Sequence, residues 1–154
     1  MQFGFPATCF AKTASIACTA TLRNGTGVMP TPTRSRVVQA RAAAAQQVAY
    51  VTILLGANDL CTSSPSTMTS TDAFKAQFHE AMATLKQLPN ARIFVSSIPD
   101  IYQLWKVLHT NRVARTVWAT AHICPSMLGA TRTEAERQQV VAREVAFNQI
   151  LAEG

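Results

Sequence analysis

The feature that most constrains the fold is a short apolar run at residues 49–55, which is rich in β-branched residues and ends at Gly56. Its length and composition predict a strand that is buried on both faces, as in a parallel sheet. A helix is expected at about residues 72–88, and a second strand at residues 91–97. Strand, helix and strand at this spacing form a βαβ unit, whose crossover is right-handed and whose strands are parallel.

The helices follow from apolar periodicity and from end signals. Ser70 or Thr71 can cap the 72–88 helix, and Pro89 stops it. The apolar residues of this helix keep to one face, and they are Phe74, Phe78, Ala81, Met82, Leu85 and Leu88. Further helices are expected at residues 37–47, from about residue 101, at about 112–121 and at about 133–151.

The last of these helices has the clearest start signal. Thr133 with Glu136 three residues later is a capping-box pattern. Its apolar residues are Val140, Val141, Val145, Phe147, Ile150 and Leu151. Taken together, the segments predict an α/β fold with a mostly parallel sheet and flanking helices.

Length and composition limit the classes of protein that fit. The chain has 154 residues, which suits one domain, and its 48% hydrophobic and 14% charged residues describe a globular chain. No run of about 18 apolar residues occurs, so no membrane span is expected. The N-terminus lacks an early positive charge, and Lys12 interrupts its one weakly apolar stretch, so no signal peptide is expected in this chain.

The formal net charge of +6 is unevenly spread. Five basic residues and no acidic residue precede Tyr50, whereas nine basic residues nearly balance eight acidic ones from there on. Arg34, Arg36 and Arg41 form a short basic cluster without aromatic neighbours. A nucleic-acid module needs a basic face with aromatic residues or a known motif, so no nucleic-acid partner is expected.

The stretch with the most chemical information is Gly56-Ala57-Asn58-Asp59, directly after the first predicted strand. Ligands of open α/β sheets bind beyond the carboxyl ends of the strands, so Asn58 is placed at the edge of a site. Its carboxamide can donate a hydrogen bond to a developing oxyanion, and the preceding glycine lets the backbone approach closely. The alternative is an Asn-Asp turn whose side chains bond their own backbone.

This pattern resembles the SGNH hydrolase family, also called GDSL esterases and lipases, whose third motif block reads Gly-x-Asn-Asp after a central strand. Leu60-Cys61-Thr62 and the later segment from Ile98 to Trp105 are similar to the extracellular bacterial branch. The resemblance covers roughly residues 37–154 and implies a partial domain of the three-layer, flavodoxin-like kind.

The resemblance also implies a function and a site. Asn58 and Gly56 would belong to the oxyanion hole, and Asp59 would orient the loop. Gly27 is the nearest candidate for the lone glycine of the second block. The complete parent would cleave a small-molecule or lipid ester without a cofactor and would be extracellular.

Two motif blocks of the family are missing. The nucleophile belongs to a Gly-Asp-Ser block and the base to an Asp-x-x-His block, yet no Asp precedes Asp59 and none follows Asp100. The expectation is therefore a fragment of a serine ester hydrolase that is inactive as it stands. Ser96 or Ser97 with a histidine is a weaker alternative nucleophile. A non-catalytic binding or interaction protein on the same fold is the alternative function.

Residues 1–36 stay unassigned. They lack acidic residues, and Gly25, Gly27, Pro30 and Pro32 punctuate a Thr-rich stretch that is typical of a loop. A non-native or disordered segment is expected here. One hypothesis is a frameshifted reading of the proper N-terminal coding region.

The cysteines and aromatic residues leave alternatives open. Cys61 and Cys124 would form a disulfide in an extracellular parent, whereas free thiols are the default in the cytosol. His122-Ile-Cys124 offers a metal only two ligands, so no metal site is expected. Trp105, Trp118 and Tyr102 would line an acyl pocket or, as is commoner for aromatic residues on helices, belong to the core.

Overall fold

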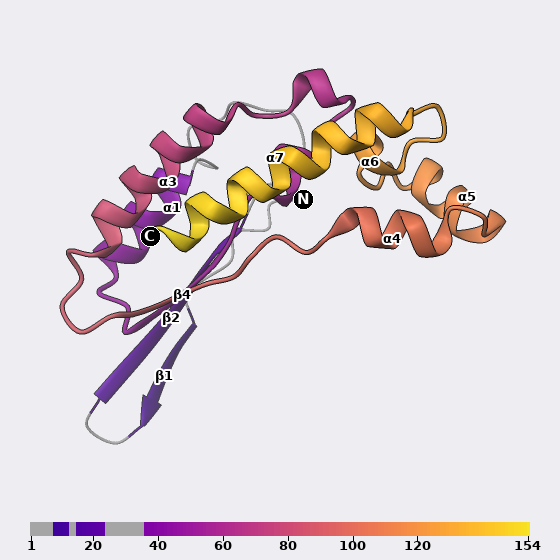
Figure 1. Ribbon diagram of the computed structural model, residues 1–154. Coiled ribbons are helices and arrows are strands. Elements are labelled where there is room, and N and C mark those ends of the chain that lie inside the picture. Colours follow the sequence, from indigo (N-terminus) through magenta and orange to yellow (C-terminus); the bar gives the residue numbers. More distant parts are fainter. Residues whose placement is uncertain (1–7, 13–14, 24–35) are drawn as a thin grey trace. The chain divides into compact units, whose positions relative to one another are not determined.

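The computed structural model describes residues 8–12, 15–23 and 36–154 (Figure 1). These residues gather into two compact units. The first unit takes in the described residues up to Leu55, together with residues 76–96 and Gly154. The second unit consists of residues 56–75 and 97–153.

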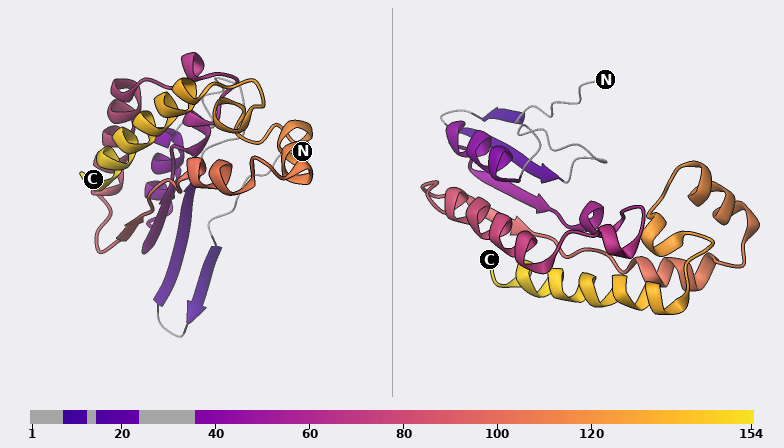
Figure 2. Two further views of the ribbon diagram at one scale, coloured as in Figure 1. Left: turned by 45° about the vertical axis from the view of Figure 1, so that its right-hand side comes forward. Right: turned by 90° about the horizontal axis from the view of Figure 1, so that it is seen from above.

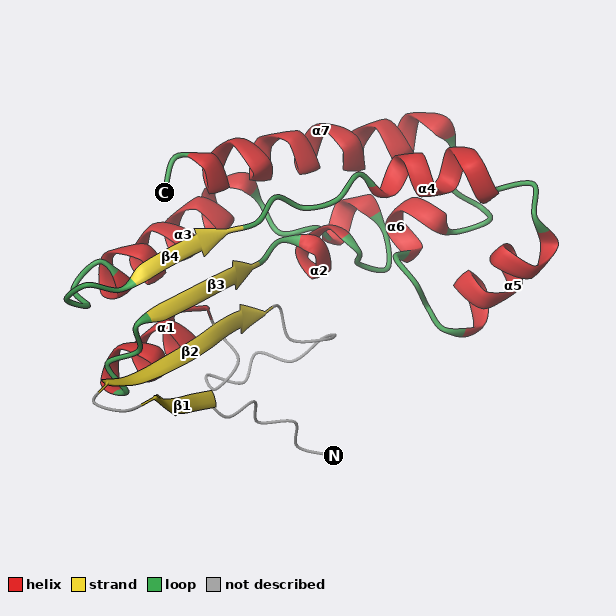
Figure 3. Cartoon of the chain, turned by 90° about the horizontal axis from the view of Figure 1, so that it is seen from below, coloured by secondary structure: helices red, strands yellow, loops and turns green. Residues whose placement is uncertain are grey.

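The first unit contains a sheet of four strands in the order β1 (Thr8–Lys12), β2 (Ser15–Arg23), β3 (Tyr50–Leu54) and β4 (Arg92–Val95) (Figure 3). Strands β1 and β2 are antiparallel, whereas β2, β3 and β4 are parallel. The register places Val51 opposite Ile93. The α/β fold, the mostly parallel sheet and the parallel βαβ pair predicted from the sequence are all confirmed.

Two helices lie on one face of this sheet, α1 (Arg36–Ala45) and the part of α3 (Thr71–Leu85) from residue 76 onward (Figures 2 and 3). Ser70 caps α3, because its hydroxyl accepts a hydrogen bond from the amide of Ala73 at 3.2 Å. The apolar face predicted for this segment is confirmed, since its six residues are each at most 9% exposed: Phe74, Phe78, Ala81, Met82, Leu85 and Leu88.

Burial of β3 on both faces was expected, and this prediction was wrong. Val51 and Ile53 are fully buried, but Tyr50 and Leu54 are 40% and 44% exposed. Phe94 of β4, which lies opposite Thr52 on the same face, is 52% exposed. The physical reason is the alternation of side chains along a strand, because α1 and α3 cover only the face that holds Val51 and Ile53.

The second unit is mainly helical. Its elements are α2 (Ala57–Leu60), the 3₁₀ turn η2 (Pro65–Thr67), α4 (Ile101–Leu108), α5 (Arg112–Thr120), α6 (Pro125–Leu128) and α7 (Glu134–Ala152). The capping box at Thr133 and Glu136 is present and confirms the predicted start of α7. The short elements α2, η2 and α6 were not predicted, since three or four residues carry no readable period.

The core of this unit is centred on two stacked rings. Phe74 and Phe147 are fully buried, and their ring centroids lie 3.9 Å apart at an interplanar angle of 9°. Of the apolar residues of α7, Val140, Ile150 and Leu151 are buried, whereas Val145 is 51% exposed. Glu144 occupies the buried face in its place, at 7% exposure. In contrast, α4 has no buried residue and α5 has only Trp118.

Strands β1 and β2 fall within the segment that the sequence left unassigned. Gly27 and the predicted loop around it lie outside the described residues. Across the described ranges, no helix has both the length and the apolar character that crossing a membrane requires.

Candidate active site

Gly56 directly follows β3 and has a backbone that only glycine adopts readily. Its φ of 102° lies in the region that disfavours residues with a Cβ atom. A Cβ at this position would also come within 2.2 Å of Ile98 Cδ1, and within 3.4 Å of Phe74 Cε2. Both the torsion and the close approach therefore require glycine, as the sequence suggested for the turn after the strand.

Helix α2 begins one residue later and carries Asn58. The Gly56 carbonyl accepts hydrogen bonds from the amides of Asp59 and Leu60, at 3.1 and 3.2 Å. Leu60 is buried, whereas Asn58 is exposed. The short helix thus turns Leu60 into the protein and leaves Asn58 exposed.

Asp59 holds this loop rather than facing outward. Its carboxylate accepts a hydrogen bond from the Thr69 hydroxyl at 2.8 Å, and its carbonyl accepts one from the Thr69 amide at 3.1 Å. The Arg143 guanidinium of α7 donates in turn to the Thr69 carbonyl. Asp59 is therefore linked through Thr69 to the long helix, an arrangement that suits a residue that orients the loop.

A second link from α7 reaches Gly56 from another side. The Asn148 carboxamide accepts from the Ile98 amide at 2.7 Å and donates to the Ile98 carbonyl at 3.2 Å. Ile98 is buried, and its side chain occupies the space beside Gly56. One helix thus fixes both the segment that contains Asp59 and the segment that contacts Gly56.

The end of α2 is attached to α6. Cys61 and Cys124 are joined by a disulfide with an S–S distance of 2.03 Å, the pair that the sequence suggested for an extracellular parent. Ser126, which is fully buried, donates through its hydroxyl to the Leu60 carbonyl at 2.5 Å. The Ser126 amide donates to the Thr62 carbonyl at 2.9 Å. Residues 56–61, here called the 56–61 loop, are therefore held at both ends.

Glu144 of α7 is a buried carboxyl near the segment that follows Ile98. Burial, reinforced by the negative charge of Asp100, raises the pKa of Glu144 to about 7, although a hydrogen bond from the Ile101 backbone acts in the opposite direction. Its Oε2 atom has no hydrogen-bond partner among the described residues. At neutral pH this carboxyl is therefore partly protonated, and so it can act as a donor.

Other residues that could carry chemistry take different roles. Gly27 lies outside the described residues. His109 faces its own helix, because Nδ1 lies 3.1 Å from the carbonyls of Trp105 and Lys106. Cys124 is committed to the disulfide, so the His122-Cys124 pair offers no thiolate to a metal. Nowhere in the part of the chain that the structure describes do three His, Cys, Asp or Glu side chains gather in a metal-binding cluster.

The anchoring residues were missed from the sequence. Arg143 and Thr69 are 74 residues apart, and Asn148 and Ile98 are 50 apart, so no local pattern joins them. One signal was present, however. Glu144 lies four residues after Val140 and three before Phe147, so a charged residue falls on the buried stripe of the helix.

Comparison with known proteins identifies the family. The family model described as GDSL-like Lipase/Acylhydrolase matches residues 11–146, which is most of the chain. The match thus begins well before residue 37, where the sequence resemblance was placed. No curated protein and no solved structure matches the chain significantly. The family match and the α/β fold lead to the same conclusion, and the chain belongs to the GDSL-like lipase/acylhydrolase family.

Proposed function

We propose that this chain is the oxyanion-hole portion of a serine ester hydrolase. The proposal rests on the 56–61 loop, in which Gly56 is fixed beside Ile98 and Asn58 is exposed. Membership of the GDSL-like family supports ester hydrolysis as the reaction class. In the proposed mechanism, the Asn58 carboxamide donates to the oxygen that becomes negative when an ester carbonyl is attacked, and Gly56 lets the backbone come close to the same oxygen.

Fixing such a donor in advance is what makes it effective. A preorganised donor needs no reorganisation when charge develops, and its removal typically costs about 2.7–4 kcal/mol of transition-state stabilisation. The links from α7 through Thr69 and Ile98 restrain the loop that carries Asn58. Asn58 and Gly56 are therefore the residues proposed to act on the substrate, and Asp59 is proposed to position them.

We further propose that the chain is inactive as it stands. Hydrolysis through a serine needs a base that takes the serine proton, and the sequence has neither a Gly-Asp-Ser nor an Asp-x-x-His block. The oxyanion donor then has no attacking group to assist. The substrate of the complete enzyme is proposed to be a small-molecule or lipid ester. The Cys61–Cys124 disulfide supports an extracellular location, because disulfides persist in oxidising compartments.

The direct test is hydrolysis of p-nitrophenyl acetate and p-nitrophenyl butyrate by the purified chain, with Asn58→Ala as the matched control. Both proteins are expected to match the buffer rate, and neither is expected to form a covalent adduct with a fluorophosphonate probe. A serine adduct on the wild-type chain, mapped by mass spectrometry, would instead establish a nucleophile and refute the proposed inactivity.

The origin of the chain is tested at the coding locus. We expect sequencing of about 150 codons on each side to find Gly-Asp-Ser upstream in another frame and Asp-x-x-His downstream. Expression of that longer chain would then test Asn58 itself. Asn58→Ala should lower kcat by about 10²–10³-fold, with little change in KM. If the flanks contain neither block, the fragment proposal fails.

A second candidate function is a non-catalytic interaction protein on the same fold. The observation that favours it is the partly exposed sheet face with Tyr50, Leu54 and Phe94. Analytical ultracentrifugation distinguishes the two proposals. A single defined oligomer would support a binding role, whereas heterogeneous aggregation would support a hydrolase fragment.

A further inference from the structure

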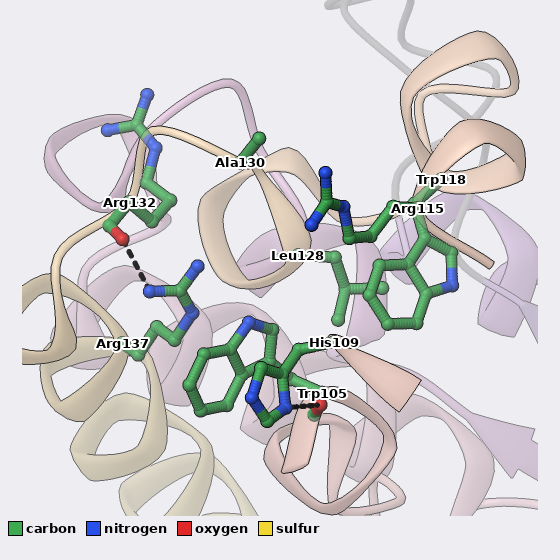
Figure 4. Close-up of a pocket in the computed structure, with 8 residues that line it drawn as sticks. All are labelled: Trp105, His109, Arg115, Trp118, Leu128, Ala130, Arg132 and Arg137. Carbon is green, nitrogen blue, oxygen red and sulfur yellow. Dashed lines mark hydrogen bonds between the residues drawn. The ribbon is translucent and has the colours of Figure 1, made fainter. Parts of the chain in front are cut away.

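The second unit contains a cavity of about 300 Å³ that the proposed hydrolase function does not use (Figure 4). The residues that line it come from α4 and the residue that follows it, from α5, α6 and α7, and from the segment between α6 and α7. They are Trp105, His109, Arg115, Trp118, Leu128, Ala130, Arg132 and Arg137. We call it the Trp105–Trp118 cavity. This volume is at the lower end of the range for small-molecule sites.

The charge of the lining is one-sided. Three arginines and one histidine line the cavity, and no carboxylate does. Arg132 is neutralised, because its guanidinium bonds Glu136 at 2.7 Å. The Arg115 guanidinium has no hydrogen bond or ion pair in the part of the chain that the structure describes. Arg115 is an exposed residue, so water solvates its charge, and its donors are open to an incoming group.

Arg137 adds a second cation that is nearly buried. Its side chain is 5% exposed, and its two terminal nitrogens donate to the carbonyls of Arg132 and Gly129, at 2.5 and 3.0 Å. These partners are neutral carbonyls, and the Nε atom has no partner among the described residues. Burial is the main cause that lowers the pKa of Arg137. The negative charges of Glu134 and Glu136 act in the opposite direction, and an anion in the cavity would add to their effect.

The remaining lining is aromatic. Trp105 is stacked between other groups, with the His109 ring centroid at 4.5 Å and the Arg137 guanidinium carbon at 4.3 Å from its ring. Trp118 is 7% exposed, and Figure 4 shows its indole near Arg115 and Leu128. Because these groups occupy the faces of Trp105 and Trp118 is mostly covered, a planar ring in the cavity would meet the indoles edge-on.

From this combination we propose that the Trp105–Trp118 cavity binds a small organic anion that carries one aromatic ring, with the anionic group against Arg115 and the ring against the tryptophans. A neutral aromatic molecule would leave the Arg115 charge unused, and a metal cation would be repelled. Whether the tryptophans line a pocket or the core was open from the sequence. Trp105 and Trp118 line this cavity, and Tyr102 instead stacks on Trp105 and bonds Glu134. The proposal concerns binding only and stands apart from ester hydrolysis.

The two tryptophans make the test direct, because they are the only ones in the chain and both line the cavity. Intrinsic tryptophan fluorescence of the full chain is titrated with benzoate, with its neutral isostere benzamide and with inorganic sulfate. Benzoate is expected to change the emission saturably and to bind about tenfold or more tightly than benzamide, as one charge-assisted hydrogen bond implies. Sulfate is expected to bind more weakly than benzoate, since it has no ring.

Variants assign the site. Arg115→Met should lower the affinity for benzoate about tenfold and leave the affinity for benzamide unchanged. Arg115→Lys should lower the affinity for benzoate by a smaller factor. Arg112→Met is the matched control, because Arg112 is an exposed residue of the same helix that does not line the cavity. Circular dichroism checks that each variant remains folded. The proposal is overturned if benzoate causes no saturable change in tryptophan fluorescence, or if benzamide or sulfate binds as tightly as benzoate. It is also overturned if Arg112→Met and Arg115→Met lower the affinity for benzoate equally.

Discussion

The 56–61 loop and the Trp105–Trp118 cavity belong to the same unit but are built from different contacts. The loop is tied by a disulfide, by the buried Ser126 hydroxyl and by backbone hydrogen bonds. The cavity is formed partly by α4, which has no buried residue, and by α5, which buries only Trp118. Elements with few buried apolar side chains open at a lower free energy than packed ones. The loop is therefore suited to a fixed donor, and the cavity to a ligand that its helices can accommodate.

The largest effect should come from removing the disulfide that holds the loop. The double variant Cys61→Ala with Cys124→Ala frees two residues that are 63 apart in the sequence. The chain-entropy relation for a loop of this length gives a loss of about 4 kcal/mol in the free energy of unfolding. Urea denaturation followed by circular dichroism measures it.

A matched variant isolates the covalent contribution. Ser126→Ala removes the hydroxyl that bonds Leu60 but keeps the disulfide, and it should cost about 1–2 kcal/mol. Equal losses in the serine variant and the double cysteine variant would mean that the disulfide adds nothing to the attachment of α2 to α6.

The second largest effect is expected at Gly56. Gly56→Ala adds a Cβ that lies 2.2 Å from Ile98 Cδ1, on a backbone with φ of 102°. Left-handed strain and overpacking together should destabilise the chain by about 2–4 kcal/mol in urea denaturation. Adding Ile98→Val removes the Cδ1 atom and should restore part of the loss. No recovery in this double variant would show that the torsion alone requires glycine.

A pH-dependent effect should come from Glu144, which lies on α7 between the loop anchors Arg143 and Asn148. Its folded pKa of about 7 exceeds the ordinary value of 4.5, so the native state binds more protons than the unfolded state between these values. Stability should therefore be highest below pH 4.5 as far as this group is concerned, and should fall as the pH rises through 7. Glu144→Gln should remove this slope and stabilise the chain at pH 8 by about 2 kcal/mol.

Asp100 provides the control for this prediction. Asp100→Asn removes the second cause of the raised pKa, so the fall in stability should end at a lower pH than in the wild-type chain. Asparagine also accepts hydrogen bonds at a helix N-cap, so the bond that Asp100 accepts from the Gln103 amide can be retained. Thermal unfolding from pH 4 to pH 8 compares the three proteins. A Glu144→Gln profile that parallels the wild-type profile would contradict the assignment.

The two regions also differ in how far the sequence predicts them. The Gly-x-Asn-Asp segment and its flanking strand and helix were predicted, because each depends on residues that are close together in the chain. The residues that hold this segment, Asn148 and Arg143, were not, since they act across separations of 50 and 74 residues. The cavity was only partly foreseen. Its two tryptophans were noted. Its arginines come from α5, from α7 and from the segment between α6 and α7, and no pattern in the sequence shows that these parts pack together.

The smallest effect should come from removing the N-cap of α5, which tests whether this helix unfolds separately from the rest of the unit. Asn111 caps α5, and its side chain accepts from the amides of Val113 and Ala114 at 2.9 and 3.1 Å. Asn111→Ala should cost about 1 kcal/mol in that helix. Because α5 buries only Trp118, the loss should appear as faster amide exchange in residues 112–120, with little change in global unfolding.

The matched variant is Thr133→Ala, which removes the capping box of α7. This helix carries the buried residues Val140 and Phe147 as well as the anchors of the 56–61 loop, so a loss of similar size should lower the global free energy of unfolding. If Asn111→Ala lowers global stability as much as Thr133→Ala, then α5 unfolds together with the core. The cavity would then be as firmly held as the loop, and the contrast between the two regions would have to be abandoned.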